Sequence, residues 1–244
     1  MNVWNRIFSE FIGTFCLVFF GCGAVAVDGI YGGVLGSVGV SLAFGLVIMI
    51  MIYAVGNISG AHFNPAVTIG FFFARRLKAK RIAPYILSQF AGALSAAGVL
   101  RLLFPESQGL GMTEPAGGLW TSALVEVLLT FVLMFVILNV SSGHMEKGIM
   151  AGVAIGGTVA LAALAFGPIS GASMNPARSL GPAAFSWRWQ DQWIYMTAPV
   201  MGAALASPMC RLIQGKQCCD HIRETGSPGR ETGETWSREE LNGG

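Results

Sequence analysis

Six apolar stretches of about twenty residues each dominate this sequence and limit what it can fold into. An α-helix needs roughly 20 apolar residues to cross the ~30 Å hydrocarbon core of a bilayer. Only 11% of the 244 residues are charged, against about 25% in a soluble domain. We therefore predict an all-α membrane protein whose six transmembrane helices lie at about residues 7–27, 34–55, 82–104, 120–140, 148–167 and 193–214.

Composition also argues against several function classes. The formal net charge of +2 is too small to indicate nucleic-acid binding. The sequence contains no Gly-rich phosphate loop, no recognisable catalytic triad and no cluster with metal-ligand spacing. We therefore expect no enzyme activity, no cofactor and no bound metal, and the lipid bilayer is the first expected partner.

One eleven-residue motif occurs in two similar copies. Residues 58–68 read ISGAHFNPAVT and residues 169–179 read ISGASMNPARS. Asn64 and Asn175 are 111 residues apart, and two span-starting glutamates, Glu10 and Glu126, are 116 apart. Each half thus has three spans. Because an odd number of spans ends on the opposite side of the membrane, the second half is inserted in the opposite direction to the first. We predict an inverted repeat, about 5–104 and 120–214, with a site at the midplane between the halves.

Each copy of the motif also predicts the start of a helix. Asn is a favoured N-cap residue, and Pro suits the first helical position. The two helices, about 64–73 and 175–184, have about ten residues and therefore a length of about 15 Å each. Two such re-entrant half-helices, meeting at their N-termini, together span the membrane. Irregular backbone at this depth is tolerated only where it is buried or lines water.

Two helix N-termini at the midplane would repel cations, because each carries about half a positive charge. The amides of Asn64 and Asn175 could donate hydrogen bonds to a passing oxygen, which would orient water and interrupt proton conduction. Arg178 follows the second motif where the first has Val67. A lone Arg at this depth is costly unless it faces a cavity, so we interpret it as a second cation barrier, with an interfacial snorkelling Arg as the alternative.

Other polar residues leave alternatives open. Glu10 and Glu126 either support the repeated loops or form a proton relay in an ion-coupled transporter. His62 is either a hydrogen-bonded structural residue or a gate that senses pH, and Gln89 in the third span is interpreted as a packing residue. A third class, a structural membrane-junction protein, would need adhesive outer loops, and the loops here are short.

The basic cluster at residues 75–81 sets the orientation. It should face the cytoplasm, which places both termini inside; Arg101, near the end of the third span, disagrees with this orientation. Residues 1–215 form the channel domain, and the polar tail 216–244 should be a disordered cytoplasmic segment. Cys218 and Cys219 in this tail could bind a metal or carry a lipid, or be free thiols.

Two Asn-Pro-Ala boxes in a six-span inverted repeat resemble the aquaporin or major intrinsic protein family. The boxes are Asn64, Pro65, Ala66 and Asn175, Pro176, Ala177, and the resemblance covers about residues 5–214. It implies a passive water channel that excludes protons and ions, assembled as a homotetramer with one pore per subunit. It further implies that Glu10 and Glu126 accept hydrogen bonds from the loop amides, with His62 in a supporting role.

The resemblance also implies a narrow filter formed by Phe44, Ala163, Ala172 and Arg178. Water-selective members usually have His where Ala163 stands. Glycerol facilitators usually have Trp at Phe44 and a bulky aromatic at Ala172. Two alanines should widen this filter, so glycerol, ammonia, hydrogen peroxide and metalloid hydroxides are candidate solutes besides water. Residues 167–183 look most like bacterial relatives of the nodulin-type proteins, which suggests a bacterial inner membrane.

Overall fold

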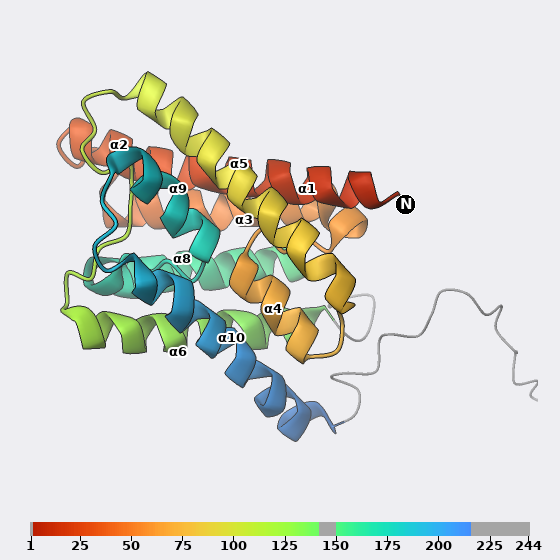
Figure 1. Cartoon of the computed structure of the whole chain (residues 1–244). Coiled ribbons are helices and arrows are strands. Elements are labelled where there is room, and N and C mark those ends of the chain that lie inside the picture. Colours follow the sequence, from red (N-terminus) through yellow and green to blue (C-terminus); the bar gives the residue numbers. More distant parts are fainter. Residues whose placement is uncertain (1, 142–149, 216–244) are drawn as a thin grey trace, which may run out of the picture.

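The computed structural model describes residues 2–141 and 150–215, and these residues form helices and loops without a β-strand. Six helical segments are long and apolar enough to span a membrane, as the sequence predicts. Figure 1 shows two shorter helices, α4 and α9, lying between α5 and α10. The elements are α1 (Val3–Cys16), η1 (Leu17–Cys22), α2 (Gly23–Ile30), α3 (Gly36–Ser59), α4 (Pro65–Phe73), η2 (Ala79–Arg81), α5 (Ile82–Leu103), α6 (Leu119–Val140), α8 (Ala151–Ser170), α9 (Pro176–Ser186) and α10 (Gln192–Gln214).

Three details of the expected elements need correction. The second and fifth spans extend beyond residues 55 and 167, because α3 continues to Ser59 and α8 to Ser170. The glycine after each serine then ends the helix in the left-handed conformation, with φ of 93° at Gly60 and 78° at Gly171. The second half-helix continues to Ser186, two residues beyond the expected end. The first span is a regular α-helix only in part, since η1 is a π-helical turn.

The helix pairs reflect the internal repeat. α1 packs along α5 in the first half and α6 along α10 in the second, while α3 packs on α8 across the boundary between the halves. Two equivalent glycines permit the first two pairings. A Cβ at Gly92 would lie 2.4 Å from the carbonyl oxygen of Phe11, and one at Gly202 would lie 2.2 Å from that of Val127. Small residues allow membrane helices to approach this closely.

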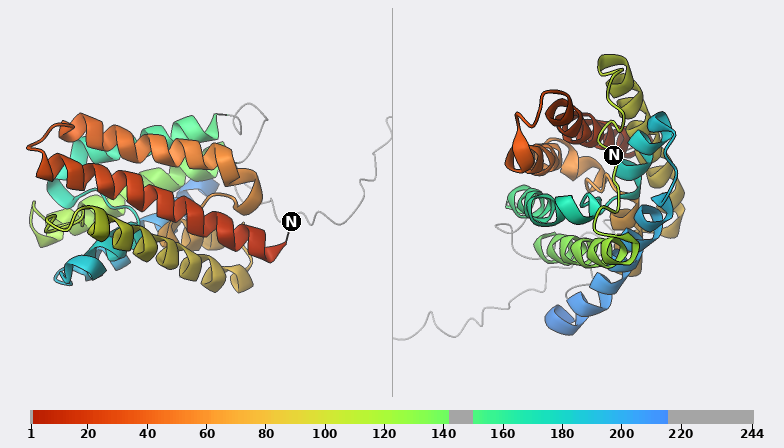
Figure 2. Two further views of the ribbon diagram at one scale, coloured as in Figure 1. Left: turned by 90° about the horizontal axis from the view of Figure 1, so that it is seen from above. Right: turned by 90° about the vertical axis from the view of Figure 1, so that its left-hand side faces the viewer.

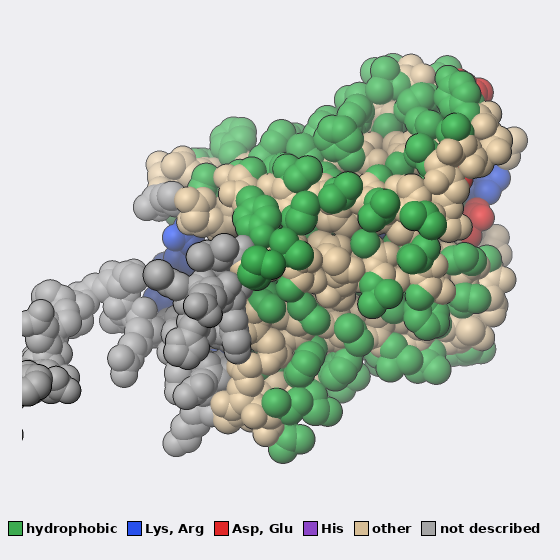
Figure 3. Space-filling model, turned by 180° about the vertical axis from the view of Figure 1, so that it is seen from behind, with side chains coloured by type: hydrophobic (Ala, Val, Ile, Leu, Met, Phe, Trp, Pro, Cys, Tyr) green, Lys and Arg blue, Asp and Glu red, His purple; other side chains and the backbone are tan. Residues whose placement is uncertain are grey.

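Polar and apolar surfaces are separated along the helix axes. Figure 3 shows hydrophobic side chains spread over the helical face and charged side chains gathered at its two ends. The N-terminus, the α4–α5 connection with its basic residues and the end of α10 all lie at one end of the molecule (Figures 1 and 2). Cys218 and Cys219 lie outside the described residues, as does the tail from residue 216.

Arg101, which disagrees with the predicted orientation, is held in place by backbone carbonyl groups. Its guanidinium donates to the carbonyl oxygens of Pro105 (3.2 Å), Ser107 (2.7 Å) and Phe185 (3.0 Å). Its charge therefore fastens the end of α5 to the following loop and to α9. A structural role of this kind explains why this Arg lies at the end opposite the basic cluster.

Candidate functional site

The two half-helices begin at matching asparagines, as their sequence predicts. Asn64 and Asn175 are the N-cap residues of α4 and α9, each followed by Pro at the first helical position. The Asn64 Oδ1 accepts from the N–H groups of Ala66 (2.8 Å) and Val67 (3.4 Å). The Asn175 Oδ1 accepts equivalently from Ala177 (3.0 Å) and Arg178 (3.3 Å). Each side-chain oxygen is thereby committed to its own helix.

The amide nitrogens of the same two asparagines join the halves of the molecule. The Asn64 Nδ2 donates to the Met174 carbonyl oxygen at 2.7 Å, and the Asn175 Nδ2 donates to that of Phe63 at 2.9 Å. An amide nitrogen carries two hydrogens, so each side chain keeps one further N–H available. Both asparagines line the cavity described below.

Glu10 and Glu126 hold the loops that precede the half-helices. Each carboxylate accepts two consecutive backbone N–H groups, from His62 (3.0 Å) and Phe63 (2.7 Å) at Glu10 and from Ser173 (2.8 Å) and Met174 (2.7 Å) at Glu126. Both side chains are fully buried, and neither lines the cavity. Their backbone contacts are therefore all to the loops that precede the half-helices.

A second layer of contacts surrounds these carboxylates. Gln89 donates through Nε2 to Glu10 (2.7 Å) and to the Thr68 hydroxyl (2.9 Å). The same hydroxyl contacts His62 Nδ1 at 3.0 Å. His62 thus lines the cavity with one ring nitrogen already engaged. The sequence suggested that Gln89 only packs between helices, but its amide links α5 to both the glutamate and the half-helix.

The backbone of the two loops is strained at equivalent positions. Ala61 and Phe63 have φ of 50°, and their counterparts Ala172 and Met174 have φ of 40° and 53°. Left-handed conformations in non-glycine residues cost of order 1–3 kcal/mol each and persist where the surroundings enforce them. Here the glutamate–amide bonds do so. Ala172 is thereby placed with its methyl group among the residues that line the cavity.

A cavity of about 480 Å³ runs along the half-helix junction. Its wall includes all four residues expected at the filter, both motif asparagines and His62, and it extends to residues near the basic end of the molecule, such as Tyr53 and Ser141. Most of its surface is apolar, since α3, α6 and α8 supply Phe44, Ile48, Ile52, Leu133, Ile137, Ile155 and Val159. The polar groups of the wall come from the loops that precede α4 and α9, from Arg178, from Tyr53 and Asn57 near the end of α3, and from Ser141 at the end of α6.

Arg178 is the charged residue among those that line this cavity in the described part of the chain. Its side chain is 4% exposed, and Nη1 donates to the Gly111 carbonyl oxygen at 2.7 Å. Its guanidinium lies over the Phe44 ring, 4.9 Å from the centroid. Within residues 2–141 and 150–215 the one ion pair joins Arg188 to Glu114. No described carboxylate therefore neutralises the Arg178 charge by contact.

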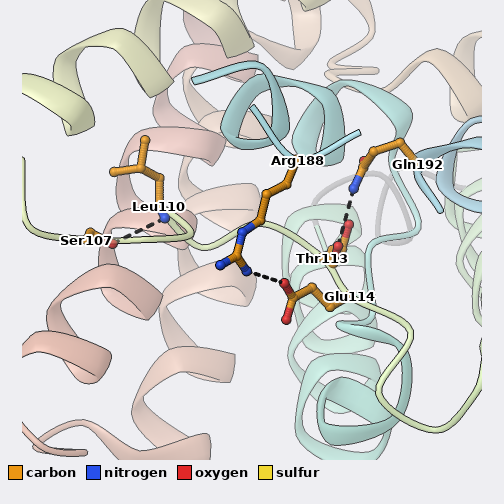
Figure 4. Close-up of polar contacts among 6 residues, drawn as sticks. All are labelled: Ser107, Leu110, Thr113, Glu114, Arg188 and Gln192. Atoms are coloured by element: carbon orange, nitrogen blue, oxygen red, sulfur yellow. Dashed lines mark hydrogen bonds and ion pairs between the residues drawn. The ribbon is translucent and has the colours of Figure 1, made fainter. Parts of the chain in front are cut away.

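The loop that carries Gly111 is fixed by several polar contacts (Figure 4). Ser107 Oγ accepts from the Leu110 N–H at 3.2 Å, and Gln192 donates to the Thr113 carbonyl oxygen at 3.4 Å. The Arg188–Glu114 ion pair, at 2.9 Å, connects the same loop to the segment that follows α9. These contacts hold the Gly111 carbonyl where Arg178 reaches it. Sequence reasoning did not find this partner, because a backbone carbonyl has no residue signature.

The half-helix junction, the cavity and the six apolar spans together define a multi-pass membrane protein with an internal cavity where two half-helices meet. The described residues contain no group of three or more His, Cys, Asp or Glu side chains that could hold a metal ion.

Comparisons with known proteins agree with this architecture. The Major intrinsic protein family matches residues 1–209. Aquaporin NIP1-1 of Oryza sativa subsp. japonica is 43% identical over 228 residues, covering 93% of this chain and 77% of the rice protein. Aquaporin NIP1-1 of Zea mays is 42% identical, with 93% and 78% coverage.

A solved structure supports the fold independently. The aquaglyceroporin from Plasmodium falciparum superposes with a TM-score of 0.78 at 25% identity, covering 87% of this chain and 99% of that one. The chain therefore belongs to the major intrinsic protein family, as the paired Asn-Pro-Ala boxes suggested.

Proposed function

We propose that this protein is a passive channel for water and small neutral solutes that excludes protons and ions. The observation that carries the proposal is the cavity that passes both motif asparagines and reaches Arg178. Solutes move along it without a conformational cycle, because the wall is already formed by fixed helices and hydrogen-bonded loops. The names of the related proteins, aquaporins and an aquaglyceroporin, support the same conclusion.

Ion exclusion follows from fixed charges and donors. The N-termini of α4 and α9 direct two positive helix ends toward the middle of the cavity. The remaining N–H of each asparagine donates to a water oxygen, so the water's own hydrogens turn away from the junction. This orientation interrupts a proton-conducting chain, and the positive field opposes any cation. Arg178 adds a full positive charge further along the path.

We assign the filter to Phe44, Ala163, Ala172 and Arg178, which share the cavity wall. Phe44 and Arg178 contribute an aromatic face and hydrogen-bond donors, and the two alanines leave space opposite them. The solute range then extends from water to glycerol, ammonia, hydrogen peroxide and metalloid hydroxides. The structural neighbour from Plasmodium falciparum is an aquaglyceroporin, which is in keeping with a wide filter.

The competing functions have less support. An ion-coupled transporter needs an exposed ion site, and Glu10 and Glu126 are both buried against loop amides and away from the cavity. A membrane-junction protein needs an adhesive outer surface, whereas the loop at residues 104–118 is occupied in holding Gly111 against Arg178. Catalysis has no support from the family, whose members are channels.

We further propose a homotetramer with cytoplasmic termini, residues 1–215 forming the channel domain. The shared location of the N-terminus, the basic connection and the end of α10 is in keeping with this orientation (Figure 2). The tetramer rests on family membership. The relatives compared above are plant proteins, so they lend no support to the bacterial inner membrane that the sequence suggested.

Stopped-flow light scattering on proteoliposomes tests the function. The parent protein should accelerate shrinkage in an impermeant osmolyte and re-swelling in glycerol. The Ala163→His variant should re-swell in glycerol about tenfold more slowly while keeping its water flux, because the added imidazole ring narrows the filter. A single group that does not fit a site discriminates between solutes by about this factor. A parent without glycerol flux would refute the wide filter, and a parent no faster than empty liposomes would refute the channel.

A further inference from the structure

The two halves of this protein differ around the Phe44–Arg178 contact. Arg178 takes the place that Val67 has in the first half. The first span contains the π-helical turn η1 (Leu17–Cys22), whereas the equivalent span of the second half, α6, is a regular α-helix over its whole length. At the 116-residue offset that relates Glu10 to Glu126, Gly21 of η1 corresponds to Ile137. At this sequence offset, the first half therefore has a glycine where the second half has a large side chain.

The π turn decides which residue of the first span faces α3. A π turn takes up about one residue more than an α turn, and one residue corresponds to about 100° of rotation. The residues after η1 are therefore rotated relative to those that a regular helix would present. Such turns are rare, and they occur frequently at functional sites.

Gly21 presents bare backbone to the edge of the Phe44 ring. A Cβ placed on Gly21 would lie 2.2 Å from Phe44 Cε1, 2.4 Å from Cδ1 and 2.8 Å from Cζ. The ring would have to retreat by more than about 1 Å before reaching the ~3.5 Å at which two carbon atoms attract. Phe44 is 7% exposed, lies under the Arg178 guanidinium and borders the cavity. A ring displaced from Gly21 therefore moves toward the cavity and the guanidinium.

We propose that Gly21, through the π turn that contains it, is a specificity-determining position: it allows the Phe44 ring to lie back against the first span and so sets the width of the filter. Gly21 does not itself line the cavity; it acts by positioning Phe44. The inference deepens the proposed function, because it requires Phe44 to form part of the filter.

The test is a double-mutant cycle on the full-length protein in proteoliposomes, with water and glycerol permeability measured per reconstituted channel. Gly21→Ala should lower glycerol permeability about tenfold, as a misplaced methyl group does in a fitted site, and lower water permeability by less. Phe44→Ala alone should raise glycerol permeability. In the Phe44→Ala background, Gly21→Ala should have no further effect, because the ring that it displaces is absent.

Gly23→Ala is the matched control, since it lies two residues further along the same span. Its Cβ would meet only Leu100 Cδ2, at 3.2 Å, and it does not border the cavity. It should leave the glycerol-to-water ratio unchanged. A Gly21→Ala channel with the parent ratio, or with the same loss in the Phe44→Ala background, would overturn the role of Gly21. A Phe44→Ala channel with the parent ratio would instead show that the filter assignment itself is wrong.

Discussion

Single residues settle how the irregular backbone survives inside this protein. Each re-entrant loop carries two non-glycine residues in the left-handed region, and each is held by one buried carboxylate that accepts consecutive N–H groups. Hydrogen bonds to a charged group contribute about 1.5–3 kcal/mol, which is comparable with the strain of one loop residue. A buried carboxylate is therefore used for structure here, although an intramembrane Glu is by default a functional suspect.

We expect Glu126→Gln to destabilise the folded protein by about 1.5–3 kcal/mol. The replacement keeps one acceptor oxygen but turns an NH2 group toward a backbone N–H, so one buried donor loses its partner. Thermal unfolding in detergent measures the effect. Glu114→Gln is the control, because its ion pair is half exposed and should contribute less than about 1 kcal/mol. Equal stability of the two variants would contradict the supporting role, and a flux that depends on an ion gradient in the parent but not in Glu126→Gln would favour the transporter.

At the scale of elements, the spacing between helices depends on glycines in equivalent positions of the two halves. Gly92 and Gly202 bring α5 onto α1 and α10 onto α6 at backbone contact. The first half-helix, α4, packs against α5 and α10, and α9 packs most extensively against α5. The separation of the long helices therefore controls where the half-helices sit.

Gly202→Ala should separate α10 from α6 and destabilise the protein by about 1–3 kcal/mol, the usual cost of overpacking. Gly157→Ala, in α8, is the control because no heavy atom lies within 4 Å of its added Cβ. That variant should be neutral or up to about 1 kcal/mol more stable, since Ala is the better helix former. The surviving monodisperse fraction after heating, measured by size-exclusion chromatography, distinguishes them. Comparable survival of the two variants would contradict backbone contact between α10 and α6.

For the whole molecule, we expect function to depend on the proposed channel domain, residues 1–215. The described helices end at Gln214, and the described residues that line the cavity all fall between Leu17 and Arg178. The transport path should therefore be complete within residues 1–215.

A chain that ends at Gly215 should conduct water at the parent rate per channel, to within about twofold; this tolerance corresponds to ~0.4 kcal/mol on the barrier. Stopped-flow shrinkage of proteoliposomes, normalised to the amount of reconstituted protein, checks this. A large loss of flux in correctly assembled protein would show that the tail, with Cys218 and Cys219, takes part in conduction. A loss of assembled protein alone would assign it a role in biogenesis.

The sequence by itself determined the membrane class, the six spans and the starts of both half-helices. These features are local. A membrane helix is recognised from one continuous apolar run, and a half-helix start is recognised from Asn followed by Pro. The helix ends at Ser59 and Ser170 were missed because capping by Gly60 and Gly171 depends on backbone geometry that the loops impose.

Only the tertiary structure decided what each polar group contacts and which residues share the cavity wall. Gln89 reads as packing in the sequence, and its bond to Glu10 arises because α5 crosses α1. Gly111 and Gly21 act through a carbonyl oxygen and through a missing side chain, which leave no chemical signature in a sequence. Their effect exists only when chain segments about 67 and 23 residues apart, carrying Arg178 and Phe44, are brought into contact. Contacts between distant segments are fixed by the packing of the whole molecule, and that is the physical reason why the contacts of Gly111 and Gly21 could be read only from the fold.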